Sequence, residues 1–125
     1  MSGQEFEAYV AWLLRQQGYR VEEVGGYEDM GVDLIATTAR GTRIAVQVKR
    51  WNAREVDMDA IRAVFAGKAM HNCQGALVIT NNYFTHRAKK LAGANKCKLI
   101  DRDALADEIN KLPSKKSSNL ATARS

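Results

Sequence analysis

The feature that most constrains the fold of this chain is a pair of strand-like segments separated by only three residues. Residues 31–38 (GVDLIATT) and 42–51 (TRIAVQVKRW) are rich in aliphatic and β-branched residues, which favour strands. Between them, Ala39–Gly41 fits a three-residue hairpin loop in which the glycine takes the left-handed conformation. We therefore expect an antiparallel hairpin whose register is set by this loop.

The expected register gathers polar side chains on one face of the hairpin. Pairing about Arg40 sets Asp33 opposite Gln47. It also sets Gly31 opposite Lys49, where a glycine would let the backbone of a substrate come close. Because side chains alternate along a strand, Asp33, Gln47 and Lys49 share one face. The other face is expected to carry four aliphatic residues: Val32, Leu34, Val46 and Val48.

These polar groups need a common explanation, because a charge left unpaired in a core is costly. Mg²⁺ prefers hard oxygen ligands, and Asp33, the side-chain oxygen of Gln47 and the backbone carbonyl of Val48 would supply three. Such an ion polarises a phosphate and lowers the pKa of a bound water, while Lys49 would position that water or offset charge on the phosphorane. Taken singly, Asp33 also fits a turn residue and Lys49 a strand-end lysine.

The other segments alternate between helix and strand patterns. Helical spacing of apolar residues is found over 2–19, 57–72, 85–95 and 103–112, and strand patterns over 19–24, 75–80 and 97–102. Ser2 and Glu5 have capping-box spacing, and Thr85 is a predicted N-cap. Three consecutive strands followed by strands that alternate with helices predict an α/β fold. Its mixed central sheet combines an antiparallel meander with parallel strands and is flanked by helices.

Composition sets the domain organisation and the class of partner. The predicted organisation is one domain over 1–112 and a basic, disordered tail over 113–125. The net charge of +5 favours a polyanionic partner such as nucleic acid. Cys73 and Cys97 are isolated, so a reduced, cytoplasmic setting is expected. The sequence has no apolar run of the kind that forms a signal peptide or spans a bilayer, so no membrane partner is expected.

At this point the sequence resembles a known family. Residues 3–36 (GQEFEAYVAWLLRQQGYRVEEVGGYEDMGVDLIA) followed by AVQVKRW resemble the Mrr-type restriction endonuclease catalytic domain of the PD-(D/E)XK nuclease superfamily. The resemblance extends from about residue 3 to about residue 105. The aspartate, the glutamine or glutamate, and the lysine of the family match Asp33, Gln47 and Lys49.

The resemblance implies a restriction-endonuclease-like fold and a DNA endonuclease that depends on Mg²⁺, for which Mn²⁺ can substitute. A glutamate of the first helix often assists such a metal site. Glu7 is the best match here, with a solvent-exposed helix residue as the alternative. Gln47 stands where much of the wider superfamily has an acid, so the site carries one negative charge fewer. Mrr-like members commonly have glutamine here, and activity is still expected.

Basic and polar residues near the motif are candidates for contact with DNA, and the alternative for each of them is a solvated charged face. They lie around the hairpin loop and after the motif lysine: Arg40, Arg43, Arg50, Trp51, Asn52 and Arg54. Thr80, Asn81 and Asn82 end the apolar strand, where the sequence fits either a turn or a phosphate contact.

Two alternative functions stay open at this level. One is a structure-specific nuclease such as a Holliday-junction resolvase, which would act as a dimer. The other is a catalytically inert DNA-binding module of the same fold. The sequence contains no separate recognition domain, and a homodimer or a partner subunit could supply specificity.

Overall fold

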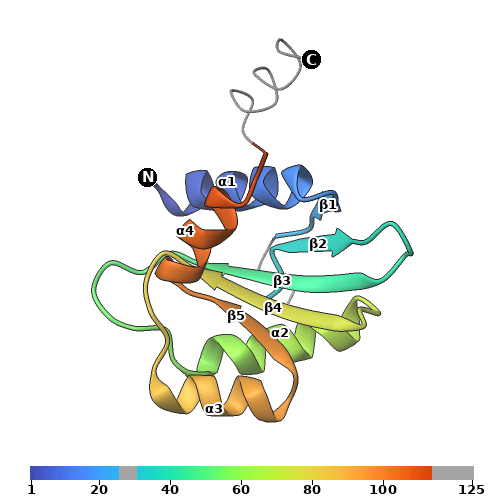
Figure 1. Ribbon diagram of the computed structural model, residues 1–125. Coiled ribbons are helices and arrows are strands. Elements are labelled where there is room, and N and C mark those ends of the chain that lie inside the picture. The colour runs from blue at the N-terminus through green and yellow to red at the C-terminus, as the bar shows by residue number, and fades with distance from the viewer. Residues whose placement is uncertain (26–30, 114–125) are drawn as a thin grey trace.

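The computed structural model describes residues 1–25 and 31–113 and has a central sheet between two helix layers (Figure 1). The elements follow the expected order of helices and strands: α1 (Gly3–Gln16), β1 (Arg20–Glu23), β2 (Leu34–Thr37), β3 (Arg43–Lys49), α2 (Met58–Met70), β4 (Gly75–Thr80), α3 (His86–Ala94), β5 (Cys97–Ile100) and α4 (Arg102–Asn110). The predicted tail lies outside the described residues except for Pro113. No helix of the described part is both long and apolar enough to cross a membrane.

The sheet has five strands in the order β1-β2-β3-β4-β5. The β1–β2 and β2–β3 pairs are antiparallel, and the β3–β4 and β4–β5 pairs are parallel. This arrangement confirms the predicted mixed sheet. The hairpin register is confirmed as well, since Leu34 pairs with Val46 and the Thr38 N–H donates to the Thr42 carbonyl at 2.9 Å. Gly41 has a φ of +90°, as the loop requires.

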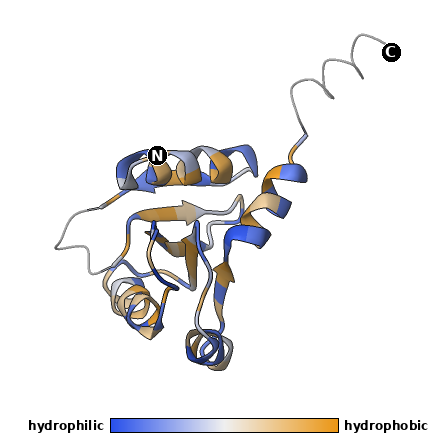
Figure 2. Ribbon diagram, turned by 90° about the vertical axis from the view of Figure 1, so that its left-hand side faces the viewer, coloured by the Kyte–Doolittle hydropathy of each residue, from blue (hydrophilic) through white to orange (hydrophobic). Residues whose placement is uncertain are grey.

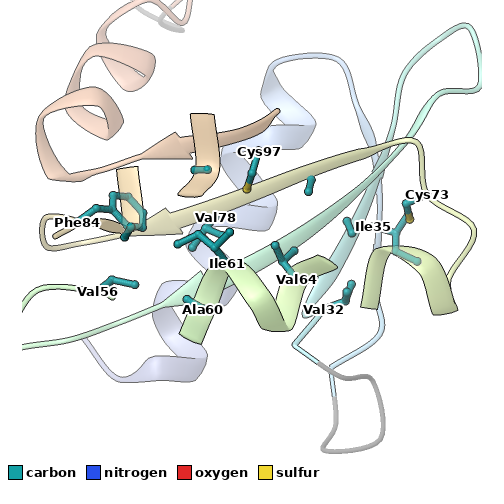
Figure 3. Packing of buried hydrophobic residues seen from close by; sticks show 14 residues of the cluster. Val32, Ile35, Val56, Ala60, Ile61, Val64, Cys73, Val78, Phe84 and Cys97 are labelled. Atoms are coloured by element: carbon teal, nitrogen blue, oxygen red, sulfur yellow. The ribbon is translucent and has the colours of Figure 1, made fainter. Parts of the chain in front are cut away.

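Two apolar cores lie on the two faces of the sheet. On the α1 and α4 side, Val10, Leu13 and Leu105 pack against residues such as Leu34 and Val46. The α2 and α3 side is shown in Figure 3, where side chains of α2 meet Val78 of β4. Figure 2 shows hydrophobic residues concentrated in the strands between the helices. Burial of an aliphatic side chain stabilises the folded state by about 1.5–3 kcal/mol, so these cores hold the helices against the two faces of the sheet.

The helix starts follow the local sequence. Ser2 and Glu5 form the predicted capping box on α1. The Thr85 hydroxyl accepts a hydrogen bond from the Ala88 N–H at 3.1 Å, which confirms it as the N-cap of α3. Asp57 is the N-cap residue of α2, but its side chain makes no capping bond and instead binds Arg87 and Thr85.

The prediction that Val32 lies on the same face of the sheet as Leu34 is wrong. Val32 is buried with Val64 on the α2 side of the sheet, whereas Leu34 is buried on the α1 side. The strict alternation fails because the paired ladder begins only at Leu34. Just before it, the Asp33 N–H donates to the Val46 carbonyl at 2.8 Å, and the chain leaves the sheet.

Gly31 also differs from the expectation that it gives room to a substrate. Its φ is +81°, and a Cβ at this position would lie only 2.6 Å from the Cβ of Ala63. The glycine is therefore required by the close approach of α2. Its predicted place opposite Lys49 is not part of the ladder between β2 and β3.

Candidate active site

Asp33 lies immediately before β2, at the end of the sheet where β3 finishes. Its Oδ2 accepts a hydrogen bond from the Val48 N–H at 2.8 Å. Its carbonyl accepts a hydrogen bond from the Val24 N–H at 3.0 Å, which ties it to the chain after β1. The backbone of neighbouring chain segments thus holds the carboxylate of Asp33 beside the last residues of β3.

Glu7 of α1 reaches the same place from another element. An open pocket of about 510 Å³ is lined by Gln4, Glu7, Glu23, Gly25 and Asp33. A Cβ built on Gly25 would lie 3.5 Å from Glu7 Oε1 and 3.8 Å from Asp33 Oδ1. The two carboxylates therefore flank one glycine, and the pocket opens to solvent between α1 and the end of the sheet.

The electrostatics of this pocket disfavour an additional negative charge. Burial raises the pKa of Glu7, and the nearby carboxylates of Asp33 and Glu23 raise it further. Glu23 is joined loosely to Arg15, with 3.9 Å between Arg15 Nη2 and Glu23 Oε2. Glu23 was not predicted as a site residue. No local pattern in the sequence pointed to it, because Glu23 lies beside Asp33 only through its pairing with Leu34 in the β1–β2 ladder.

Gln47 is buried, with a relative exposure of 7%. Its Oε1 has no hydrogen-bond partner among the described residues. A buried acceptor without a partner costs about 1–3 kcal/mol, so such an atom is unusual in a structural position. Gln47 lies within β3, near the end of the strand, and directly precedes Val48, whose N–H binds Asp33.

Lys49 is the last residue of β3 and is half-buried. It pairs with Thr80 of β4, and its Nζ lies 5.7 Å from the centroid of the Trp51 ring. Lys49 and Gln47 lie on the same face of β3 as Ala45, which packs in the core on the α2 side. The structure therefore brings Glu7 and Asp33 together in one pocket. Gln47 and Lys49 lie at the same end of the sheet, but they are not among the described residues that line that pocket.

The donor set fits a hard cation. The carboxylates of Asp33 and Glu7 and the amide oxygen of Gln47 are hard ligands of the kind that Mg²⁺ prefers. The Gln47 Oε1, which has no hydrogen-bond partner among the described residues, fits a ligand role. The described residues contain no group of three or more His, Cys, Asp or Glu side chains arranged to hold a metal ion. A site here would thus combine carboxylates with an amide and a backbone oxygen. The role of the Val48 carbonyl as a ligand in this site stays a prediction.

The predicted DNA-contacting residues fall into two groups at opposite ends of β3 (Figure 1). Four follow Lys49 at the active-site end: Arg50, Trp51, Asn52 and Arg54. Arg40 and Arg43 lie at the hairpin end, about 20 Å away along the strand. Arg43 donates from Nη2 to the His71 carbonyl at 3.1 Å, so it also fastens the end of α2.

The sequence matches a known nuclease family over most of its length. The chain belongs to the Mrr_cat family, described as restriction endonuclease, whose model matches residues 1–109. The predicted family and the restriction-endonuclease-like fold are confirmed. No match to this sequence was found among curated proteins.

Solved structures share this fold at low sequence identity. The DNA modification-dependent restriction endonuclease AspBHI is 15% identical with a TM-score of 0.68, covering 84% of this chain and 30% of that chain. MspJI, solved in complex with a 27-mer oligonucleotide, is 18% identical with a TM-score of 0.62, covering 94% and 30%. A repair endonuclease from Pyrococcus abyssi is 17% identical with a TM-score of 0.54, covering 79% and 46%. The chain thus spans less than half the length of each.

Proposed function

We propose that this chain is a Mg²⁺-dependent DNA endonuclease of the Mrr-like restriction type, acting in the cytoplasm, and that Mn²⁺ can replace Mg²⁺. The observation that carries the proposal is the buried Oε1 of Gln47, which has no hydrogen-bond partner among the described residues. It lies at the end of the sheet where the carboxylates of Glu7 and Asp33 flank one glycine. Membership of a restriction endonuclease family gives that arrangement its chemical context.

Each residue of the site has a distinct role in the proposed reaction. Asp33, Gln47 and the Val48 carbonyl would hold the metal ion, with Glu7 assisting from α1. When bound, the ion polarises a phosphate and lowers the pKa of a water molecule. The Val48 N–H fixes one oxygen of Asp33, which keeps the carboxylate oriented. Lys49 orients the attacking water or offsets the charge that develops on the phosphate.

The segment after β3 is the proposed DNA contact of this domain. Arg50 and Arg54 would bind backbone phosphates close to Lys49, and the net charge of +5 supports the approach of a polyanion. The match to MspJI, solved with an oligonucleotide, supports this partner. Because phosphate contacts release counterions, affinity should fall steeply as salt rises. A second copy of the chain or another subunit would then supply sequence specificity.

A second candidate is a structure-specific nuclease. The fold shared with a repair endonuclease favours it. The two candidates use the same residues for hydrolysis and differ in the DNA that they select.

The test is incubation of the full chain with supercoiled plasmid and with a four-way DNA junction, with Mg²⁺, Mn²⁺ or a chelator. We expect nicking or linearisation of plasmid with either metal and none with the chelator. Cleavage of the junction but not of plasmid would favour the structure-specific candidate. DNA binding without cleavage of any substrate would contradict both and favour the inert DNA-binding module.

A further inference from the structure

The chain that follows Lys49 is held by two asparagines from the end of the neighbouring strand. The parallel strands β3 and β4 end at the pair Lys49 and Thr80. Beyond this pair, the Trp51 N–H donates to Asn81 Oδ1 at 2.9 Å. Asn82 Nδ2 donates to the Trp51 carbonyl at 3.1 Å. Both backbone polar groups of Trp51 are therefore bound by side chains that extend from β4.

Asn82 is itself fixed in one orientation. Its Nδ2 also donates to the Arg54 carbonyl at 3.1 Å, and its Oδ1 accepts from the Tyr83 N–H at 2.8 Å. Its own N–H donates to Thr80 Oγ1 at 3.2 Å, and its carbonyl accepts from the Arg102 N–H at 2.8 Å. Because each kind of polar group on Asn82 has a partner, a flip of the amide would lose hydrogen bonds.

The ring of Trp51 connects this network to the lysine. Lys49 Nζ lies 5.7 Å from the ring centroid, which is within the range of a cation–π contact. The Arg54 guanidinium lies 5.1 Å from the same centroid. The ring also packs against the core on the α2 side. The position of the ammonium group thus depends on the ring, and the ring depends on a backbone held by two amides.

We propose that Asn81, Asn82 and Trp51 form a clamp that positions the Lys49 ammonium for the reaction. The role in catalysis rests on the proposed nuclease function, whereas the geometry of the clamp does not. In this proposal Trp51 is a positioning residue, whereas the sequence placed it among the candidates for contact with DNA. Misplacing a reacting group by about 1 Å can slow a reaction by about a hundredfold, so such a clamp has a measurable effect.

The geometry can be tested without metal or DNA. In the full chain with ¹³C-labelled lysine, the ring current of Trp51 should shift the Hε signals of Lys49 upfield of the exposed lysines. We expect Trp51→Leu to abolish this shift, Trp51→Phe to keep part of it and Asn82→Asp to reduce it. Trp12→Leu is the matched control, because it removes an exposed tryptophan stacked on Tyr9 of α1. A Lys49 signal that is the same in the wild type and in Trp51→Leu would overturn the clamp.

The catalytic part is tested by separating turnover from binding. Asn81→Ala should lower kcat for plasmid nicking by about ten- to a hundredfold, with the Kd for DNA unchanged. Asn95→Ala is the control, since Asn95 makes a similar bond, from Nδ2 to the Leu91 carbonyl at 2.9 Å, at the end of α3. Weaker DNA binding with unchanged kcat would contradict the positioning role. A wild type that cleaves no DNA would refute the nuclease function, while the lysine signals would still decide whether the clamp exists.

Discussion

The surroundings of two carboxylates near the candidate active site, those of Asp57 and Glu7, shift their pKa values in opposite directions. Asp57 accepts hydrogen bonds from Arg87 Nε at 2.9 Å and from the Thr85 hydroxyl at 2.8 Å, joining the starts of α2 and α3. These bonds, from Arg87 and then Thr85, hold the pKa of Asp57 far below its ordinary range. Glu7 has a raised pKa, because it is partly buried and lies near other carboxylates.

We propose that this difference separates a stabilising contact from a functional one. The Asp57 group has its counter-charge within the chain, so it favours the folded state without any ligand. Glu7 shares its pocket with Asp33 and Glu23, and burial together with these like charges makes its ionisation cost stability. We propose that a bound cation would offset this cost.

The largest effect is expected from a change on the functional side. Lys49→Ala should reduce plasmid nicking by about a hundred- to a thousandfold, because it removes a group that serves the developing charge. Stabilisation by Mg²⁺, measured as a rise in Tm, should be retained because Lys49 is not a proposed ligand. Lys98→Ala, on the exposed part of edge strand β5, is the matched control and should nick DNA normally. Normal nicking by Lys49→Ala would refute the role of Lys49.

Gln47 offers a way to adjust the metal site by one charge. Gln47→Ala should lower nicking by about ten- to a hundredfold, the scale observed when support of a metal site is removed. Gln47→Glu should tighten Mg²⁺ binding, because it adds a negative charge. Both are measured by the Mg²⁺ concentration that gives half-maximal nicking. If neither substitution changes that concentration, Gln47 only packs in the core.

The stabilising side should respond to pH in a defined direction. Asp57→Asn should lower Tm modestly at neutral pH, since it loses the pair with Arg87. Because the folded pKa of Asp57 is depressed, the stabilisation is present above its ordinary value of 3.8 and is lost as the pH falls below it. The Tm difference from wild type should therefore shrink in acid. Asp107→Asn, on the exposed part of α4, is the matched control.

The smallest effect is expected at Glu7, and it has the opposite sign. The folded pKa of Glu7 is raised from 4.5, so its ionisation costs stability at neutral pH and none in strong acid. Glu7→Gln should raise Tm by about 1–3 °C at neutral pH, with no gain well below its ordinary pKa. The exposed Glu22→Gln is the control. A fall in Tm at neutral pH would contradict the contrast between the two groups.

Most of the fold follows from local patterns in the sequence. The capping box of Ser2 and Glu5 and the apolar strand Gly75–Thr80 are found where the sequence places them. The hairpin register follows from the loop around Arg40. The positions of Val32 and Gly31 do not follow, because these two residues, which precede the β2–β3 ladder, pack against α2.

The candidate site was predictable where it depends on the hairpin and not where it depends on contacts between distant segments. The hairpin places Gln47 and Lys49, and the family resemblance adds Glu7. The pocket position of Glu23 and the hydrogen bonds of Asn82 join segments that no local pattern links. The hairpin register already places Arg40 at the opposite end of β3 from the residues that follow Lys49.

The account is tested most directly by a paired measurement on Asp33→Ala. A gel-shift isotherm and a plasmid-nicking rate with Mg²⁺ are recorded for the wild type and the folded variant. We predict that nicking is abolished while duplex binding is kept or slightly improved, because a carboxylate that faces a phosphate repels it when no metal is bound. Nicking by Asp33→Ala at the wild-type rate would contradict the assignment of the active site.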